Sequence, residues 1–62
     1  MNSPDESEIF IEFVVNGNVV KATAIDAATG IEASIVGPVG GARDALADAA
    51  VRKLKYLLEK EP

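Results

Sequence analysis

The last third of this chain, residues 42–60, has the sequence ARDALADAAVRKLKYLLEK, in which apolar side chains recur at helical spacing. On a wheel of about 100° per residue these side chains span roughly 240°. A helix on the surface of a globular domain needs an apolar stripe of only about 100° or a little more. Because one small sheet covers little more than that, we predict that a second copy of the chain covers the excess. The predicted dimer interface comprises Leu46, Ala50, Val51, Leu54, Leu57 and Leu58.

The preceding segment predicts three strands, at about residues 9–15, 19–25 and 31–36, rich in β-branched and aromatic side chains. Asn16-Gly17 is typical of a type I′ hairpin turn, and this turn places Glu12 opposite Lys21. The loop 27–30 that follows Asp26 sets the second register. That register is described by three facing pairs: Ala24 with Ala33, Thr23 with Ser34, and Ala22 with Ile35. The small side chains leave a hollow for a helix.

These elements predict an α+β fold, with a three-stranded antiparallel meander followed by one C-terminal helix, within a single domain over residues 8–60. Residues 1–7 are polar and acidic, and we expect a disordered tail. Residues 37–41 contain three glycines and Pro38, so the helix has the freedom to cover the sheet of a partner chain instead of its own. The expected assembly is a homodimer, with segment exchange as one possible form.

Composition limits the chemistry. The chain has 62 residues, no cysteine and no histidine, so we expect no disulfide, no metal, no cofactor and no nucleophile–base pair of the usual kind. Asp44 and Asp48 fall on the outward side of the helix and are interpreted as solvated surface. We therefore predict that the protein is not an enzyme. The net charge of −4 does not favour a nucleic-acid partner, and there is neither a membrane span nor a signal peptide, so a cytoplasmic location is expected.

Three other interpretations remain open. Gly40, Gly41 and Arg43 lie where a glycine-rich loop enters the helix, a weak pattern for an anion site that is more often a connector. The order of elements and the basic residues Arg52, Lys53 and Lys55 are similar to the second half of a double-stranded RNA-binding domain, although the first helix is missing. The outer sheet face is apolar enough to be a contact surface for an unidentified protein partner. Its apolar residues are Phe10, Val14, Val19, Ile25 and Val36.

The run GNVVKATAIDAATGIEASIVGP, followed by AAVRKLKYLLEK, resembles a family of short uncharacterised alpha-proteobacterial proteins of unknown function. Its most specific pieces are Ala24-Ile25-Asp26 with Thr29-Gly30, and Ile35-Val36-Gly37-Pro38. The resemblance implies a bacterial cytoplasmic setting and a domain over nearly the whole folded part. It implies no activity, cofactor or substrate, and it transfers no site residues. From the sequence, the biological role is unknown.

Overall fold

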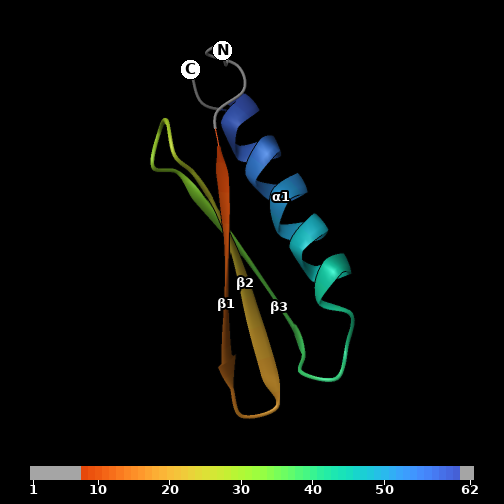
Figure 1. Ribbon diagram of the computed structural model, residues 1–62. Coiled ribbons are helices and arrows are strands. Elements are labelled where there is room, and N and C mark those ends of the chain that lie inside the picture. Colours follow the sequence, from red (N-terminus) through yellow and green to blue (C-terminus); the bar gives the residue numbers. More distant parts are fainter. Residues whose placement is uncertain (1–7, 61–62) are drawn as a thin grey trace.

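The computed structural model of the protein describes residues 8–60, and the tail predicted at residues 1–7 lies outside this range. The strands are β1 (Ile9–Asn16), β2 (Val19–Asp26) and β3 (Glu32–Pro38), and the helix is α1 (Arg43–Lys60). The strands form one antiparallel sheet in the order β1-β2-β3 (Figure 1). The α+β class, the meander and the single C-terminal helix predicted from the sequence are confirmed.

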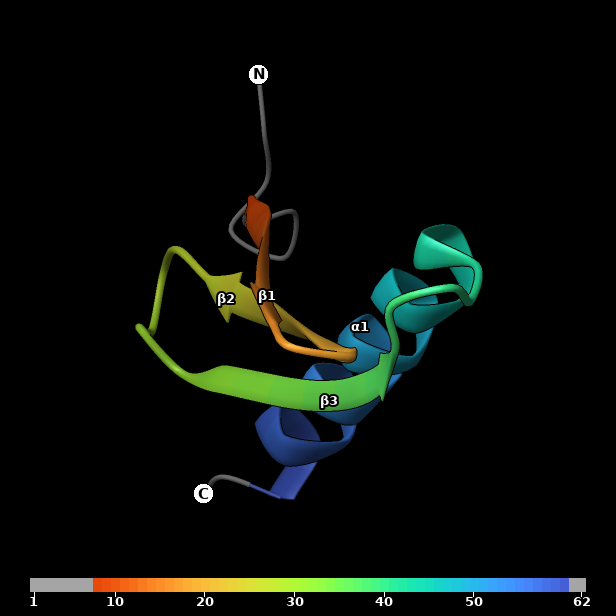
Figure 2. The same cartoon turned by 90° about the horizontal axis from the view of Figure 1, so that it is seen from below.

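The core lies between α1 and the sheet, which the helix covers on one face (Figure 2). Its centre combines alanines of the strands with two residues of the helix, and all five are buried: Ala22, Ala24, Ala33, Ala50 and Leu54. Because methyl side chains take little room, the helix approaches the sheet closely and Leu54 fills the space between them. As expected from the small side chains, α1 packs into the hollow that they leave in the sheet.

The loop between β2 and β3 has the predicted register. Ala24 faces Ala33 and Thr23 faces Ser34, whose hydroxyl oxygens lie 2.9 Å apart. The Asp26 carboxylate, only 4% exposed, accepts hydrogen bonds from the Thr29 amide at 3.0 Å and the Thr29 hydroxyl at 2.8 Å. The Asp26 carboxylate thereby accepts from a turn amide that has no backbone carbonyl as its partner.

The first hairpin differs from its prediction by two residues. The turn is Gly17-Asn18, and Asn16 faces Val19, so Glu12 lies opposite Thr23 rather than Lys21. The φ of Gly17 is +64° whereas that of Asn18 is negative, which fits a type II′ turn with glycine first, not the predicted type I′ turn. Because a shift of two residues preserves the alternation of side chains, the predicted inner face is nevertheless correct.

The connection to α1 is held by local hydrogen bonds. The Gly41 amide donates to the Pro38 carbonyl oxygen at 3.0 Å, and the Leu46 amide donates to the Ala42 carbonyl oxygen at 3.2 Å. The helix begins at Arg43, one residue later than predicted. At Gly37 the helix passes so close to β3 that an added Cβ would lie 3.0 Å from Leu46 Cδ1. Glycine at this position therefore allows the first turn of α1 to reach the sheet.

Candidate functional site

Strand β1 is the least covered of the three strands. Of its eight residues, Ile9 is half-buried and the rest are exposed. Phe10 is 54% exposed on the outer face, and Val15 is 51% exposed on the face that α1 occupies. Because β1 is at the margin of the sheet, it presents apolar side chains on both faces and a free edge between them.

The position of α1 explains this exposure. The helix packs on β2 and β3, where Leu54 and Ala50 are fully buried. The hairpin that carries the end of β1 extends past the first turn of α1 (Figure 1). Ile11 and Phe13 point to the helix side of the sheet, yet they remain 36% and 37% exposed. One helix is too narrow to cover all three strands.

The free edge of β1 also carries unpaired backbone groups. The Ala27 amide donates to the Glu8 carbonyl oxygen at 3.0 Å, so Glu8 and the even-numbered residues after it direct their backbone groups toward β2. The odd-numbered residues direct theirs outward, and these are Ile9, Ile11, Phe13 and Val15. Within residues 8–60 no other segment pairs with these amides and carbonyls, so the edge is a template for another strand.

The opposite edge, along β3, carries two features that hinder the addition of another strand. The Asp26 amide donates to the Ile31 carbonyl oxygen, and by the same alternation the carbonyl of Ser34 points away from β2. That carbonyl accepts a 3.1 Å hydrogen bond from the Lys53 ammonium group of α1. Pro38, at the end of β3, has no amide hydrogen to offer. A lysine and a proline are two of the means by which proteins make an edge strand unavailable.

The six side chains predicted as a dimer interface lie against the sheet of their own chain. Ala50 and Leu54 are fully buried, and the other four are half-buried beside the same core: Leu46, Val51, Leu57 and Leu58. Four of the six keep part of their surface accessible, so their place in a dimer interface stays a prediction. The structure instead brings together Ile11, Phe13 and Val15 as exposed apolar residues on the free edge of the sheet.

Sequence reasoning singled out the apolar outer face, which includes Phe10 and Val14, but it missed the free edge of β1. A signal for it exists in the segment IFIEFVV, where Glu12 is the only charged side chain and both alternating sets are apolar. A strand with one solvated face normally alternates apolar and polar residues. An apolar run on both faces indicates either a central strand or an edge that pairs with another chain.

The three residues considered for anion binding do not converge. The Gly41 amide already donates to the Pro38 carbonyl oxygen. A Cβ added to Gly40 would have no atom within 4 Å, so this residue faces open space rather than an enclosed site. The Arg43 guanidinium lies 5.4 Å from the centre of the Phe13 ring, a cation–π contact that directs this side chain toward β1. Arg43 therefore joins the helix to the exposed strand.

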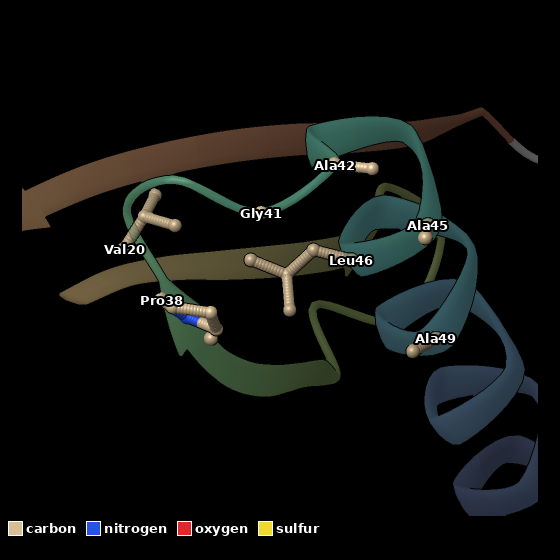
Figure 3. A pocket seen from close by; sticks show the side chains of 8 residues that line it. Val20, Pro38, Gly41, Ala42, Ala45, Leu46 and Ala49 are labelled. Carbon is tan, nitrogen blue, oxygen red and sulfur yellow. The ribbon is translucent and has the colours of Figure 1, made fainter.

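A pocket of about 200 Å³ lies at the start of α1 (Figure 3). Leu46 points into it from the helix, toward Val20 and Pro38. All of its lining residues are apolar or glycine: Val20, Gly37, Pro38, Gly41, Ala42, Ala45, Leu46 and Ala49. With no ionisable or hydroxyl side chain in its wall, the pocket offers van der Waals contact and no catalytic group.

Within residues 8–60, no group of three or more acidic side chains is arranged to hold a metal ion. Over the same residues no helix is both long and apolar enough to cross a membrane. The basic residues considered for RNA binding, Arg52, Lys53 and Lys55, are exposed on α1, with Lys53 engaged at Ser34.

The arrangement defines a small βββα domain whose distinguishing surface is an apolar strand edge. The chain belongs to the family described as a domain of unknown function, DUF6898, whose model matches residues 6–61. Neither the curated proteins nor the solved structures contain a match to the chain. The resemblance to a family of unknown function is thus confirmed, and the family description assigns no activity.

Proposed function

We propose that this protein is a small homodimeric interaction module without a catalytic site. The observation that carries the proposal is the exposure of β1, where Phe10 and Val15 are about half exposed on opposite faces of one strand. Exposed apolar side chains gathered on one element, here along both faces of β1, mark contact sites. A domain of 62 residues also gains stability that its own small core does not provide when a second chain covers such a surface.

The absence of a catalytic role is part of the proposal. The sequence has no histidine or cysteine to serve as base or nucleophile. Asp44 and Asp48 are exposed on α1, where water keeps a carboxylate solvated. The hydroxyl groups of Thr23 and Ser34, which face each other in the sheet, are hydrogen-bonded to each other. These features support an interaction role. The resemblance to alpha-proteobacterial proteins supports a bacterial cytoplasmic setting for it.

Exchange of α1 between two chains is the alternative form of the pair. In that form the helix of one copy would cover β2 and β3 of the other, and residues 38–42 would open. The surface buried would be the same as within one chain, and β1 would still be uncovered. Exchange of α1 alone therefore leaves the apolar side chains of β1 exposed, so we favour a dimer that buries β1 directly.

The test is sedimentation equilibrium at micromolar concentration with two matched variants. Val15→Lys places a charge on β1, whereas Val36→Lys places the same charge on β3 at a residue that is 60% exposed. We expect a wild-type dimer, a monomeric Val15→Lys variant and a dimeric Val36→Lys variant. A wild-type monomer would contradict the proposal. Dissociation by Val36→Lys alone would move the interface to the outer face of β3.

A further inference from the structure

We propose that β1 pairs antiparallel with β1 of a second copy, around a two-fold axis at Glu12, to form one six-stranded sheet. This inference rests on the proposed dimer and specifies its geometry. The occupant is a second copy because the free edge of β1 is complementary to itself, in backbone groups and in side chains alike. Within residues 8–60 the other free sheet edge is that of β3, where the Ser34 carbonyl is engaged by Lys53 and Pro38 has no amide hydrogen, whereas β1 carries neither feature.

Symmetry restricts the possible registers. Residues directly opposite each other in an antiparallel pair project to the same face of the sheet. Two identical strands therefore pair odd residues with odd residues and even with even, and one residue faces its own copy. The helices α1 of both copies then lie on the same face. The candidates for the self-facing residue near the middle of β1 are Ile11, Glu12 and Phe13.

The backbone favours Glu12. With Glu12 at the axis, the outward-facing residues form two kinds of hydrogen-bonded pair, Ile9 with Val15 and Ile11 with Phe13, each occurring twice. All the free amides and carbonyls of the strand edge are then satisfied. Centring the pair on Phe13 leaves Ile9 opposite Gly17, beyond the partner's strand, and centring it on Ile11 leaves Val15 without a strand partner.

The side chains favour the same register. Centring on Glu12 places Phe10 opposite Val14, and Ile11 opposite Phe13, so each exposed apolar side chain meets an apolar neighbour. Aromatic and β-branched residues are favourable cross-strand pairs. Centring on Phe13 instead sets Glu12 against Val14 and Phe10 against Asn16. Each alternative pairs an apolar side chain with a polar one.

Glu12 is the cost of this register, because the two carboxylates face each other on the outer side of the sheet. Both are exposed, so water and salt screen their repulsion. Glu12 faces Thr23, and Lys21 lies two residues along β2 from Thr23 and therefore on the same face. The register centred on Glu12 forms two more backbone hydrogen bonds than the registers centred on Ile11 or Phe13, and it forms three kinds of apolar pair. These gains outweigh the screened repulsion between the two carboxylates. Position 12 thus becomes the residue that reports the register.

Cross-linking of single-cysteine variants tests the register, because the natural chain has no cysteine and every disulfide must join two copies. We compare Ile11→Cys, Glu12→Cys and Phe13→Cys, with Val36→Cys as an exposed control away from the interface. With oxidised glutathione as oxidant, two thiols form one disulfide only where their Cα atoms lie about 4.4–6.8 Å apart. We expect Glu12→Cys to cross-link at least about tenfold faster than Val36→Cys.

A charge variant gives an independent readout that forms no new bond. Glu12→Gln removes the repulsion, and we expect the dimer dissociation constant to fall roughly two- to five-fold. Mixing the natural chain with the Glu12→Lys variant brings opposite charges together, so the mixed dimer should exceed its statistical half share. These effects require position 12 to face itself.

The outcomes separate the inference from the proposed function. A wild-type dimer in which Glu12→Cys cross-links no faster than Val36→Cys would overturn the strand pairing and leave the homodimer standing. Faster cross-linking of Ile11→Cys or Phe13→Cys would overturn the register centred on Glu12. A wild-type monomer at every concentration would overturn both proposals and assign the edge to an extended segment of a different protein.

Discussion

The ammonium group of Lys53 donates a 3.1 Å hydrogen bond to the main-chain carbonyl oxygen of Ser34, so this side chain of α1 reaches the outer edge of β3. The corresponding groups along β1 have no such cover. The two margins of one small sheet therefore differ in chemistry: one carries a cation and a proline, and the other carries apolar side chains with free backbone groups. In the proposed dimer, this difference directs the second chain to β1.

We expect Lys53→Met to expose the β3 edge and produce species larger than a dimer. The substitution keeps the length of the side chain but removes the cation that holds the Ser34 carbonyl. The free energy of unfolding should change by no more than about 1 kcal/mol, because the hydrogen bond is exposed. Sedimentation velocity over a range of concentrations measures the effect. Lys55→Met, on an exposed part of α1, is the control and should sediment like the natural protein.

Leu54→Ala should destabilise the fold severely. Leu54 is fully buried between α1 and the sheet, and removing such a side chain costs about 2–5 kcal/mol. A domain of this length has an unfolding free energy of only roughly 3–9 kcal/mol, so much of the variant should be unfolded at 25 °C. Urea denaturation at one fixed protein concentration gives the comparison. Tyr56→Ala, at a residue that is 57% exposed, should lose far less, and equal losses would contradict the assigned core.

Asp26→Ala should loosen the loop between β2 and β3. The substitution removes the acceptor of the Thr29 amide and hydroxyl. Thr29 is exposed, so water takes the place of the carboxylate, and the loss is that of hydrogen bonds to a charged group, about 1.5–3 kcal/mol. Amide exchange at Thr29 and Ile31 should accelerate together with the fall in stability. Asp48→Ala removes an exposed carboxylate and should stay within about 0.5 kcal/mol of the natural protein.

A matched pair of glycine substitutions tests the first turn. Gly17→Ala forces an L side chain to adopt a φ of +64°, at a cost of roughly 1–2 kcal/mol, although no atom lies within 4 Å of the added carbon. Gly40→Ala also meets open space, and its φ lies outside the left-handed region, so it should be neutral or slightly stabilising. Equal unfolding free energies for the two variants would show that Gly17 does not set the turn.

Much of the fold could be predicted because its signals are local. The loop after Asp26 fixed the second register correctly, since one acidic side chain and one loop length leave few ways to close it. The first register was wrong because Asn16-Gly17 and Gly17-Asn18 are both good turns, and they differ by the two residues that leave every side chain on the same face. The alternation of apolar residues does not distinguish them.

The candidate site was less predictable than the fold. The wide apolar arc of the helix indicated an uncovered surface, but it did not show which element would be left uncovered. Ala50 and Leu54 are seated against alanines of the sheet, and this placement depends on where α1 crosses the strands. That crossing is set by long-range contacts, such as the approach of Leu46 to Gly37, which no local pattern encodes.

If two copies pair through β1 as proposed, the edge of β3 decides whether further copies can add. A sheet whose two edge strands are both open allows chain after chain to add at each edge, as in fibrils. In the proposed dimer each domain uses its β1 edge once, and two β1 edges that meet leave no free β1 edge. The Lys53 hydrogen bond to Ser34 and the missing amide hydrogen of Pro38 would then favour a finite pair over an open-ended polymer.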